Sequence, residues 1–176
     1  ERILVKIIQR AKELFTQGKE INGATDEVNF FLKDFQSKSS IEQHLDKFCR
    51  LDDHDVMATI KNWCKHPDKI LATLCRSLVE RKLLKVKLQA EAFDENFVKE
   101  KQNEAMAALD IEEENTGYFV FTGEASNTTY NLEDERINIL FKDGTIKDIS
   151  QVDNALIQHN LSGATKKYYI CYLKTT

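Results

Sequence analysis

The spacing of apolar residues changes once along this chain, near residue 84, and that change limits the folds it can adopt. Before it, apolar side chains recur every three or four residues, the period of an amphipathic helix. Over 84–89 apolar and polar residues alternate, as in a half-buried strand. Later runs at 118–122 and 167–173 favour strands because they are rich in aromatic and β-branched residues. The chain is therefore predicted to be α+β, with an all-helical N-terminal part followed by a small antiparallel sheet with flanking helices.

The first helix has an apolar stripe on one side, a polar side that includes Arg10, and an end near Gly18. The stripe consists of Ile3, Leu4, Ile7, Ile8, Ala11, Leu14 and Phe15. Similar periods predict helices at 28–35, 40–48, 53–66 and 67–81. Ser40 and Gln43 resemble a capping box, and Asp52 or Asp53 can cap the helix that follows. Pro67 suits the first turn of the last of these helices.

In the second half, Asp94 is expected to cap a polar helix that runs to Ala108, and the acidic run 111–115 is expected to be a solvated loop. Asp143-Gly144 separates two apolar runs, 137–141 and 145–149, which predicts a hairpin with a type I′ turn. Ser150 is expected to cap a helix to about His159.

The balance of positive and negative residues also differs between the two halves of the chain. Residues 1–89 carry 17 Lys and Arg against 13 Asp and Glu, whereas 90–176 carry 8 against 16. We therefore expect two parts: a helical region over 1–89 and an α+β subdomain over 90–176. The basic excess is too small for a nucleic-acid-binding domain, whose isoelectric point is typically above about 9.

The class of protein follows from what the sequence contains. No apolar run approaches the roughly 20 residues that span a bilayer, so no membrane partner is expected. The cysteines show no C-x-x-C spacing, which is typical of a reduced, cytoplasmic protein. The chain starts at Glu1 and enters a helical pattern at once, so we expect it to be a piece of a longer protein.

Few residues suggest chemistry. His54-Asp55 could bind a metal ion, but it stands at an Asp-rich helix start, where capping is the better interpretation. His44, His66 and His159 have no partner at ligand spacing, and consecutive Glu112–Glu114 cannot aim at one cation. Tyr168, Tyr169 and Tyr172 could stack on bases, although packing in a sheet explains them better.

One basic cluster remains: Arg76, Arg81, Lys82, Lys85 and Lys87 place five positive charges in twelve residues at a helix-to-strand junction. Guanidinium and ammonium groups hold phosphate oxygens through charge-assisted hydrogen bonds. The alternative is a solubilising basic edge.

Three stretches resemble the C-terminal part of HD-domain phosphohydrolases. They are Leu51-Asp52-Asp53, His66-Pro67-Asp68-Lys69 and Arg81-Lys82-Leu83-Leu84-Lys85. The pattern is similar to that of the deoxynucleotide triphosphohydrolase (dNTPase) group, and the runs at 118–123 and 137–149 are similar to its bacterial branch.

The resemblance implies a parent enzyme that hydrolyses nucleoside triphosphates with a divalent metal held by an N-terminal catalytic domain. That domain is missing from this chain, which is therefore expected to be inactive, with no catalytic residue, no metal ligand and no cofactor of its own. In a mammalian member, residues that match Arg81 and Lys85 contact the phosphates of an activating nucleotide at a subunit interface. The resemblance thus implies an allosteric phosphate site at Arg81 and Lys85, with dNTP or GTP as ligand, in a homo-oligomer.

Two other functions remain open. The chain could be a non-enzymatic module that binds another protein. It could also be an independent metal hydrolase that uses His54 and Asp55.

Overall fold

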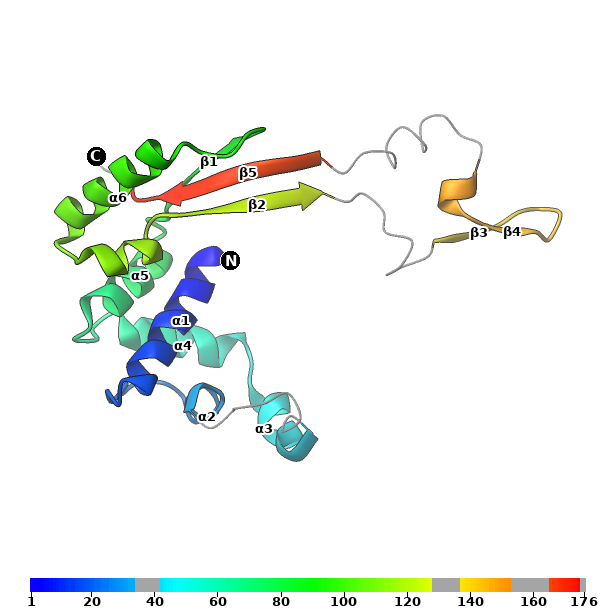
Figure 1. Ribbon diagram of the computed structural model, residues 1–176. Coiled ribbons are helices and arrows are strands. Elements are labelled where there is room, and N and C mark those ends of the chain that lie inside the picture. Colours follow the sequence, from blue (N-terminus) through cyan, green and yellow to red (C-terminus); the bar gives the residue numbers. More distant parts are fainter. Residues whose placement is uncertain (34–41, 128–136, 153–164, 175–176) are drawn as a thin grey trace. The chain divides into compact units, whose positions relative to one another are not determined.

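The computed structural model describes residues 1–33, 42–127, 137–152 and 165–174 and confirms the α+β class (Figure 1). The chain forms two compact units. The helical unit comprises Glu1–Lys85, Lys101–Val120 and Tyr172–Thr176, and the sheet unit comprises Val86–Glu100 and Phe121–Cys171. The division of the sequence at residue 89 stays a prediction.

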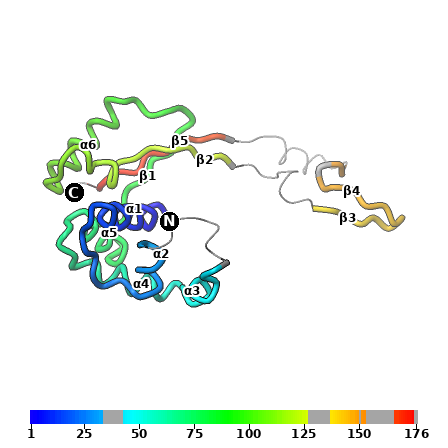
Figure 2. The backbone as a smooth tube through the Cα atoms, turned by 60° about the horizontal axis from the view of Figure 1, so that its bottom comes forward, coloured from blue at the N-terminus to red at the C-terminus, as the bar shows by residue number. Residues whose placement is uncertain are grey.

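The helical unit is built from short helices around one apolar core. Helix α1 packs against α2 and α5, and α4 also packs against both of these. Figure 2 shows the same grouping from a second direction. The helices are α1 (Arg2–Thr16), α2 (Asp26–Lys33), α3 (Leu45–Arg50) after the 3-10 turn η2 (Glu42–His44), α4 (Asp53–Trp63) and α5 (Lys69–Val79).

The prediction that Arg10 lies on the polar, solvent-facing side of α1 is wrong. Arg10 is only 9% exposed and belongs to the buried face, whereas Ile8, expected in the core, is 40% exposed. Burial of Arg10 is possible because its guanidinium finds a carboxylate on another helix, which is a contact that helix periodicity cannot show. The helix ends as expected before Gly18, which has a φ of +72°.

Local capping signals were confirmed in part. Asp52 caps α4 in a capping box with Asp55. The predicted role of Pro67 is wrong, because Asp68 caps α5 and Pro67 therefore lies before the cap. The Asp68 carboxylate accepts the Leu71 N–H, so that the first helical residue is Lys69, two residues after Pro67. Ser40 lies outside the described residues.

The sheet has the strand order β1-β5-β2, so β5 (Thr165–Tyr172) lies between β1 (Lys85–Gln89) and β2 (Phe121–Asn127) (Figures 1 and 2). β2 and β5 are antiparallel, with Gly123 opposite Tyr169. The Tyr169 ring lies over Gly123, where any side chain would collide with it. This contact confirms that Tyr169 packs in a sheet.

The prediction that β1 is half buried is wrong. Val86 and Leu88 share one face of the strand, yet they are 52% and 54% exposed. Alternation shows which side chains share a face, but packing decides whether that face is covered.

Helix α6 (Glu95–Leu109) begins as predicted, because the Asp94 carboxylate accepts the backbone N–H of Asn96 at 2.8 Å. Two predictions beyond it are wrong. Of the acidic segment, only Ile111 and Glu112 lie outside a helix, because the 3-10 helix η3 (Glu113–Tyr118) begins at Glu113, and the strand expected from residue 118 starts at Phe121. The end of η3 and the turn after it allow Tyr118, Phe119 and Val120 all to be buried, whereas a strand would turn every second side chain outward.

The predicted hairpin is present, with β3 (Asn138–Leu140) antiparallel to β4 (Ile146–Asp148). Its turn is not type I′, which needs two consecutive positive φ angles, since only Gly144 (φ +84°) has one there. The Gly144 N–H donates to the Phe141 carbonyl, which closes a three-residue loop with glycine in the left-handed position. Ser150 lies in the 3-10 turn η4 (Ile149–Gln151), and residues 153–159 of the helix predicted there lie outside the described part.

Candidate functional site

The basic cluster lies where α5 ends. Glu80 caps the helix, and its N–H donates to the Arg76 carbonyl at 2.8 Å. The next residue, Arg81, has a φ of +59° and donates its N–H to the Leu78 carbonyl at 3.3 Å. This left-handed position after a helix favours glycine, because a side chain there costs about 1–2 kcal/mol. The chain therefore places an arginine where backbone stability alone would select glycine.

Other members of the cluster already have partners. The Arg76 guanidinium donates to the Cys64 carbonyl at 3.2 Å. Lys82 pairs with Glu80 at 2.8 Å, and this ammonium holds the pKa of the Glu80 carboxyl below its usual range. Lys87 lies over the ring of Phe97, 5.1 Å from its centroid. These three cations are thus held by protein groups.

Arg81 and Lys85 are the members left available. Both side chains are exposed, and in the described part of the chain the Arg81 guanidinium has no hydrogen-bond or ion-pair partner. The Lys85 Nζ makes a longer ring contact than Lys87 does, 5.8 Å from the centroid of Tyr172 and close to the roughly 6 Å limit of a cation–π interaction, and this contact leaves its three N–H donors available. The structure therefore distinguishes these two residues from the other cations of the cluster, a distinction that the charge pattern alone does not make.

His54 and Asp55 form a helix cap. The Asp52 carboxylate accepts the backbone N–H groups of both residues, at 2.7 and 3.1 Å, and the Asp55 carboxylate accepts the N–H of Asp52. The His54 side chain is 96% exposed and lies beside Asp52. The capping interpretation is confirmed, and both aspartates are engaged in it.

No other cluster is arranged for chemistry in the ranges that the structure describes. Groups of three or more His, Cys, Asp or Glu that could hold a metal ion are absent from those ranges. His66 accepts the backbone N–H of Asp68, and Glu112–Glu114 are exposed. His159 lies outside the described residues. No helix in the same ranges is long and apolar enough to cross a membrane.

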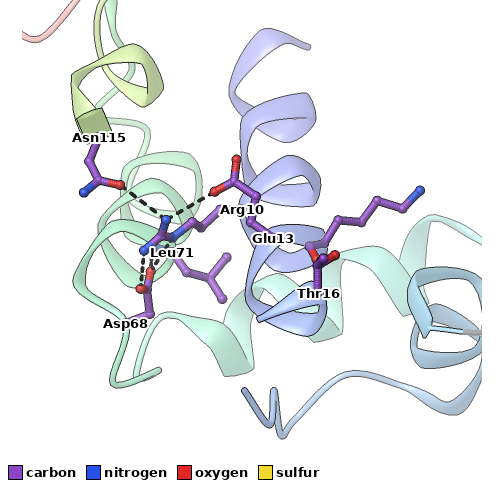
Figure 3. A network of polar contacts seen from close by, with 7 residues as sticks. Arg10, Glu13, Thr16, Asp68, Leu71 and Asn115 are labelled. Atoms are coloured by element: carbon purple, nitrogen blue, oxygen red, sulfur yellow. Dashed lines mark hydrogen bonds and ion pairs between the residues drawn. The ribbon is translucent and has the colours of Figure 1, made fainter. Parts of the chain in front are cut away.

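Sequence reasoning missed the polar network around Arg10, which is shown in Figure 3. The guanidinium binds both carboxylate oxygens of Asp68, with Nη2 to Oδ2 at 2.7 Å and Nε to Oδ1 at 3.1 Å. Its Nη1 donates to Glu13 and to Asn115, each at 3.3 Å. The same Asp68 carboxylate caps α5 through the Leu71 N–H. The network therefore ties α1 to the first turn of α5 and to η3.

The pKa shifts of Arg10 and Asp68 show that each of the two side chains stabilises the charged form of the other. Burial alone would raise the pKa of Asp68, but the hydrogen bonds from Arg10 and from the Leu71 N–H outweigh it and hold that pKa below the usual range. The Asp68 hydrogen bond also raises the pKa of Arg10. Four polar contacts occupy the guanidinium, so little of it is available to a ligand. The arginine had no sequence signal, because its partner is 58 residues away.

No family model matches the chain, but it is similar over almost its whole length to known proteins, two of which follow. A phosphohydrolase from Bacteroides thetaiotaomicron, known from a crystal structure, is 35% identical, has a TM-score of 0.84 and matches over 98% of this chain. The uncharacterized protein YwfO of Bacillus subtilis (strain 168) is 26% identical over 179 aligned residues, also 98% of this chain. The chain spans only 43% of the length of the former and 38% of the latter.

Proposed function

We propose that this chain is the C-terminal regulatory and oligomerisation part of an HD-type, metal-dependent phosphohydrolase that acts on nucleotides. The similarity to the Bacteroides phosphohydrolase along almost the whole chain supports the hydrolase class. The coverage supports a larger parent protein, because both relatives are more than twice as long as the matched part. In this proposal the chain is inactive alone and controls a catalytic domain elsewhere in the parent.

The observation that carries the proposal is the conformation of Arg81. Its backbone is left-handed, its side chain is exposed, and its guanidinium has no partner among the described residues. A position with a backbone cost and an unused charge suggests selection for binding. In the proposed mechanism, phosphate oxygens of a dNTP or GTP bind Arg81 and Lys85 and contact a second subunit. Binding of the nucleotide only to the assembled state then stabilises that state by mass action.

Among the described residues, no group of side chains fits the expected metal. The carboxylates of Asp52 and Asp55 are used in the helix cap, and His54 lies beside Asp52 on an exposed turn. We therefore assign the metal, and the bond cleavage that it would support, to the remainder of the parent protein. The part played by this chain is binding and assembly.

A protein-binding module without enzymatic function is the second candidate. The exposed face of β1 favours it, because Val86 and Leu88 present apolar side chains that a partner protein could cover. The same face would serve self-association in the first proposal. The two functions differ in whether nucleotide controls the association.

The experiment is a titration of dNTPs and GTP into the full-length gene product, with assembly followed by light scattering and triphosphate release measured in parallel. Arg81→Ala, Lys85→Ala and Arg81→Gly are expected to raise the nucleotide concentration for half-maximal assembly at least about tenfold, since each lost charge-assisted contact is worth roughly 1.5–3 kcal/mol. Lys82→Ala is the matched control, because this neighbouring cation is already paired with Glu80.

The outcomes separate the candidates. Unchanged assembly and hydrolysis in all three variants would disprove the phosphate site. Association that is independent of nucleotide but lost in Val86→Asp would support the binding module. The isolated chain, mixed with dNTPs and a divalent metal, is expected to release no triphosphate.

A further inference from the structure

The helical unit contains an open apolar groove between α1, α2 and α4, with a volume of about 200 Å³. Its floor consists of side chains that are almost fully buried: Ile7, Ile60 and Trp63. Its walls are formed by more exposed side chains, among them Leu4, Ile8, Val28, Phe31, Leu51 and Val56. The groove therefore lies directly above the core of this unit, and the apolar side chains exposed to solvent are those of its walls.

The apolar surface continues beyond the groove. The ring of Phe48, which is 51% exposed, lies against Phe31, with the two centroids 6.2 Å apart. On the α1 side Ile8 is 40% exposed. Exposed apolar side chains are ordinary when scattered, but a continuous set over a groove is typical of an interaction surface.

The polar groups of the groove limit what can bind there. The Thr59 hydroxyl already accepts the Thr25 N–H at 3.1 Å. Lys12 is the charged residue of the lining, is exposed, and has no ion-pair partner in the parts of the chain that are described. An occupant should therefore be apolar with one acidic group opposite Lys12.

The volume favours side chains over a separate small molecule. Ligand pockets usually measure about 300–1,000 Å³, and an apolar cavity of about 150 Å³ holds one benzene. At about 200 Å³, the groove has room for one or two large apolar side chains from a larger partner. A helix suits the site better than a strand, because the surrounding helices offer no unpaired backbone edge and a helix satisfies its own backbone groups.

We propose that this groove binds an amphipathic helix, with an acidic residue facing Lys12, from the remaining part of the longer protein to which this chain belongs. The inference rests on the proposed function, since the partner is the rest of the phosphohydrolase. The length of the relatives supports this choice of occupant: this chain spans only 43% of the Bacteroides protein, so more than half of such a protein is available to cover the groove.

The test is cysteine labelling of the 176-residue chain and of the full-length gene product. Ile8→Cys is the probe, and Met57→Cys is the matched control, because Met57 is 39% exposed, also lies on a helix, and is not part of the groove lining. Cys49 and Cys64 are replaced by serine, whereas Cys75 and Cys171 are buried and can stay, and burial also raises the pKa of the Cys75 thiol to about 12. Maleimide is expected to modify residue 8 readily in the isolated chain and at least ten times more slowly in the full-length product. Residue 57 should react equally in both.

Each outcome has a separate meaning. Equal labelling of residue 8 in both proteins overturns the proposal, even if the full-length product hydrolyses nucleotides. Protection of residue 8 without any hydrolysis supports the groove and contradicts the proposed function instead. Protection that appears in the isolated chain and grows with its concentration assigns the groove to a second copy and overturns the proposal, as does a gene product no longer than this chain.

Discussion

The two ends of helix α5 are opposites. At the N-terminal end, the half-buried Asp68 is bound by Arg10 through both carboxylate oxygens, while it also caps the helix. At the C-terminal end, Arg81 is exposed and adopts a strained backbone conformation. At the N-terminal end, the contacts of Asp68 stabilise the fold. At the C-terminal end, Arg81 adopts an unfavourable left-handed backbone conformation, and its guanidinium has no partner among the described residues. The contrast distinguishes a structural charge from one available for binding.

The strongest test of the contrast is Arg10→Ala. Removal of the arginine leaves the Asp68 carboxylate, whose side chain is 13% exposed, without its counter-ion, which should lower the free energy of unfolding by at most about 3–5 kcal/mol. Glu13→Ala is the control in the same network, because its side chain is 50% exposed and the loss should stay below about 1 kcal/mol. Urea denaturation of both variants measures the two values. Equal effects would show that Arg10 is no more structural than a surface ion pair.

Low pH should weaken the Arg10–Asp68 ion pair at the N-terminal end of α5. The pKa of Asp68 is depressed in the folded state, so its ion pair contributes fully above the unfolded value of about 3.9 and is lost as the pH falls through the folded pKa. The difference in unfolding free energy between the wild type and Asp68→Asn should therefore be constant from pH 7 to about pH 5 and shrink below pH 4. Denaturation curves across that range provide the measurement. A difference that does not depend on pH would mean that the carboxylate charge is not what stabilises this end.

Arg81→Gly, at the C-terminal end of α5, should not lower the free energy of unfolding as Arg10→Ala does. Glycine removes the left-handed strain at the cost of greater freedom in the unfolded chain, so stability should stay equal or rise by up to about 1 kcal/mol. Arg81→Ala keeps the strain and should give no such gain. Thermal unfolding of the pair measures the effect. A clear loss of stability in Arg81→Gly would show that the arginine supports the fold and would remove the argument for its availability.

The smallest effect is expected for Lys82→Ala. Its ammonium is 78% exposed and pairs with a half-exposed Glu80, so the change in unfolding free energy should be below about 0.5 kcal/mol. The same urea titration applies, with Glu80→Ala as the reciprocal variant. A loss near that of Arg10→Ala would mean that the C-terminal end of α5 is as structural as the N-terminal end.

The local signals of this chain predicted well wherever the contact partners are near in sequence. The Asp52 cap, the Asp94 cap and the presence of a hairpin at 137–149 each depend on residues within a few positions, so they could be inferred from neighbours alone, although the turn type of the hairpin could not. Errors arose where a nearby alternative existed, as when Asp68 rather than Pro67 defined the start of α5. Propensity shows that a boundary exists, but a single side-chain hydrogen bond decides its residue.

The candidate site shows the same limit. The sequence shows a cluster of five basic residues, and the family resemblance implies that Arg81 and Lys85 are the two that bind phosphate. It could not show that Arg76, Lys82 and Lys87 are engaged by Cys64, Glu80 and Phe97, because those contacts depend on side-chain positions around the helix end. Nor could it show that Val86 and Leu88 would stay exposed.

The sequence by itself determined the α+β class, the order of helices before strands, and the basic junction between them, because hydrophobic period and charge are local properties. Only the tertiary structure decided that Arg10 is internal, since its burial depends on a carboxylate 58 residues away that makes the loss of hydration tolerable. The same reason separates the two ends of α5: Arg10 meets a carboxylate from another helix, whereas Arg81 meets none among the residues that the structure describes.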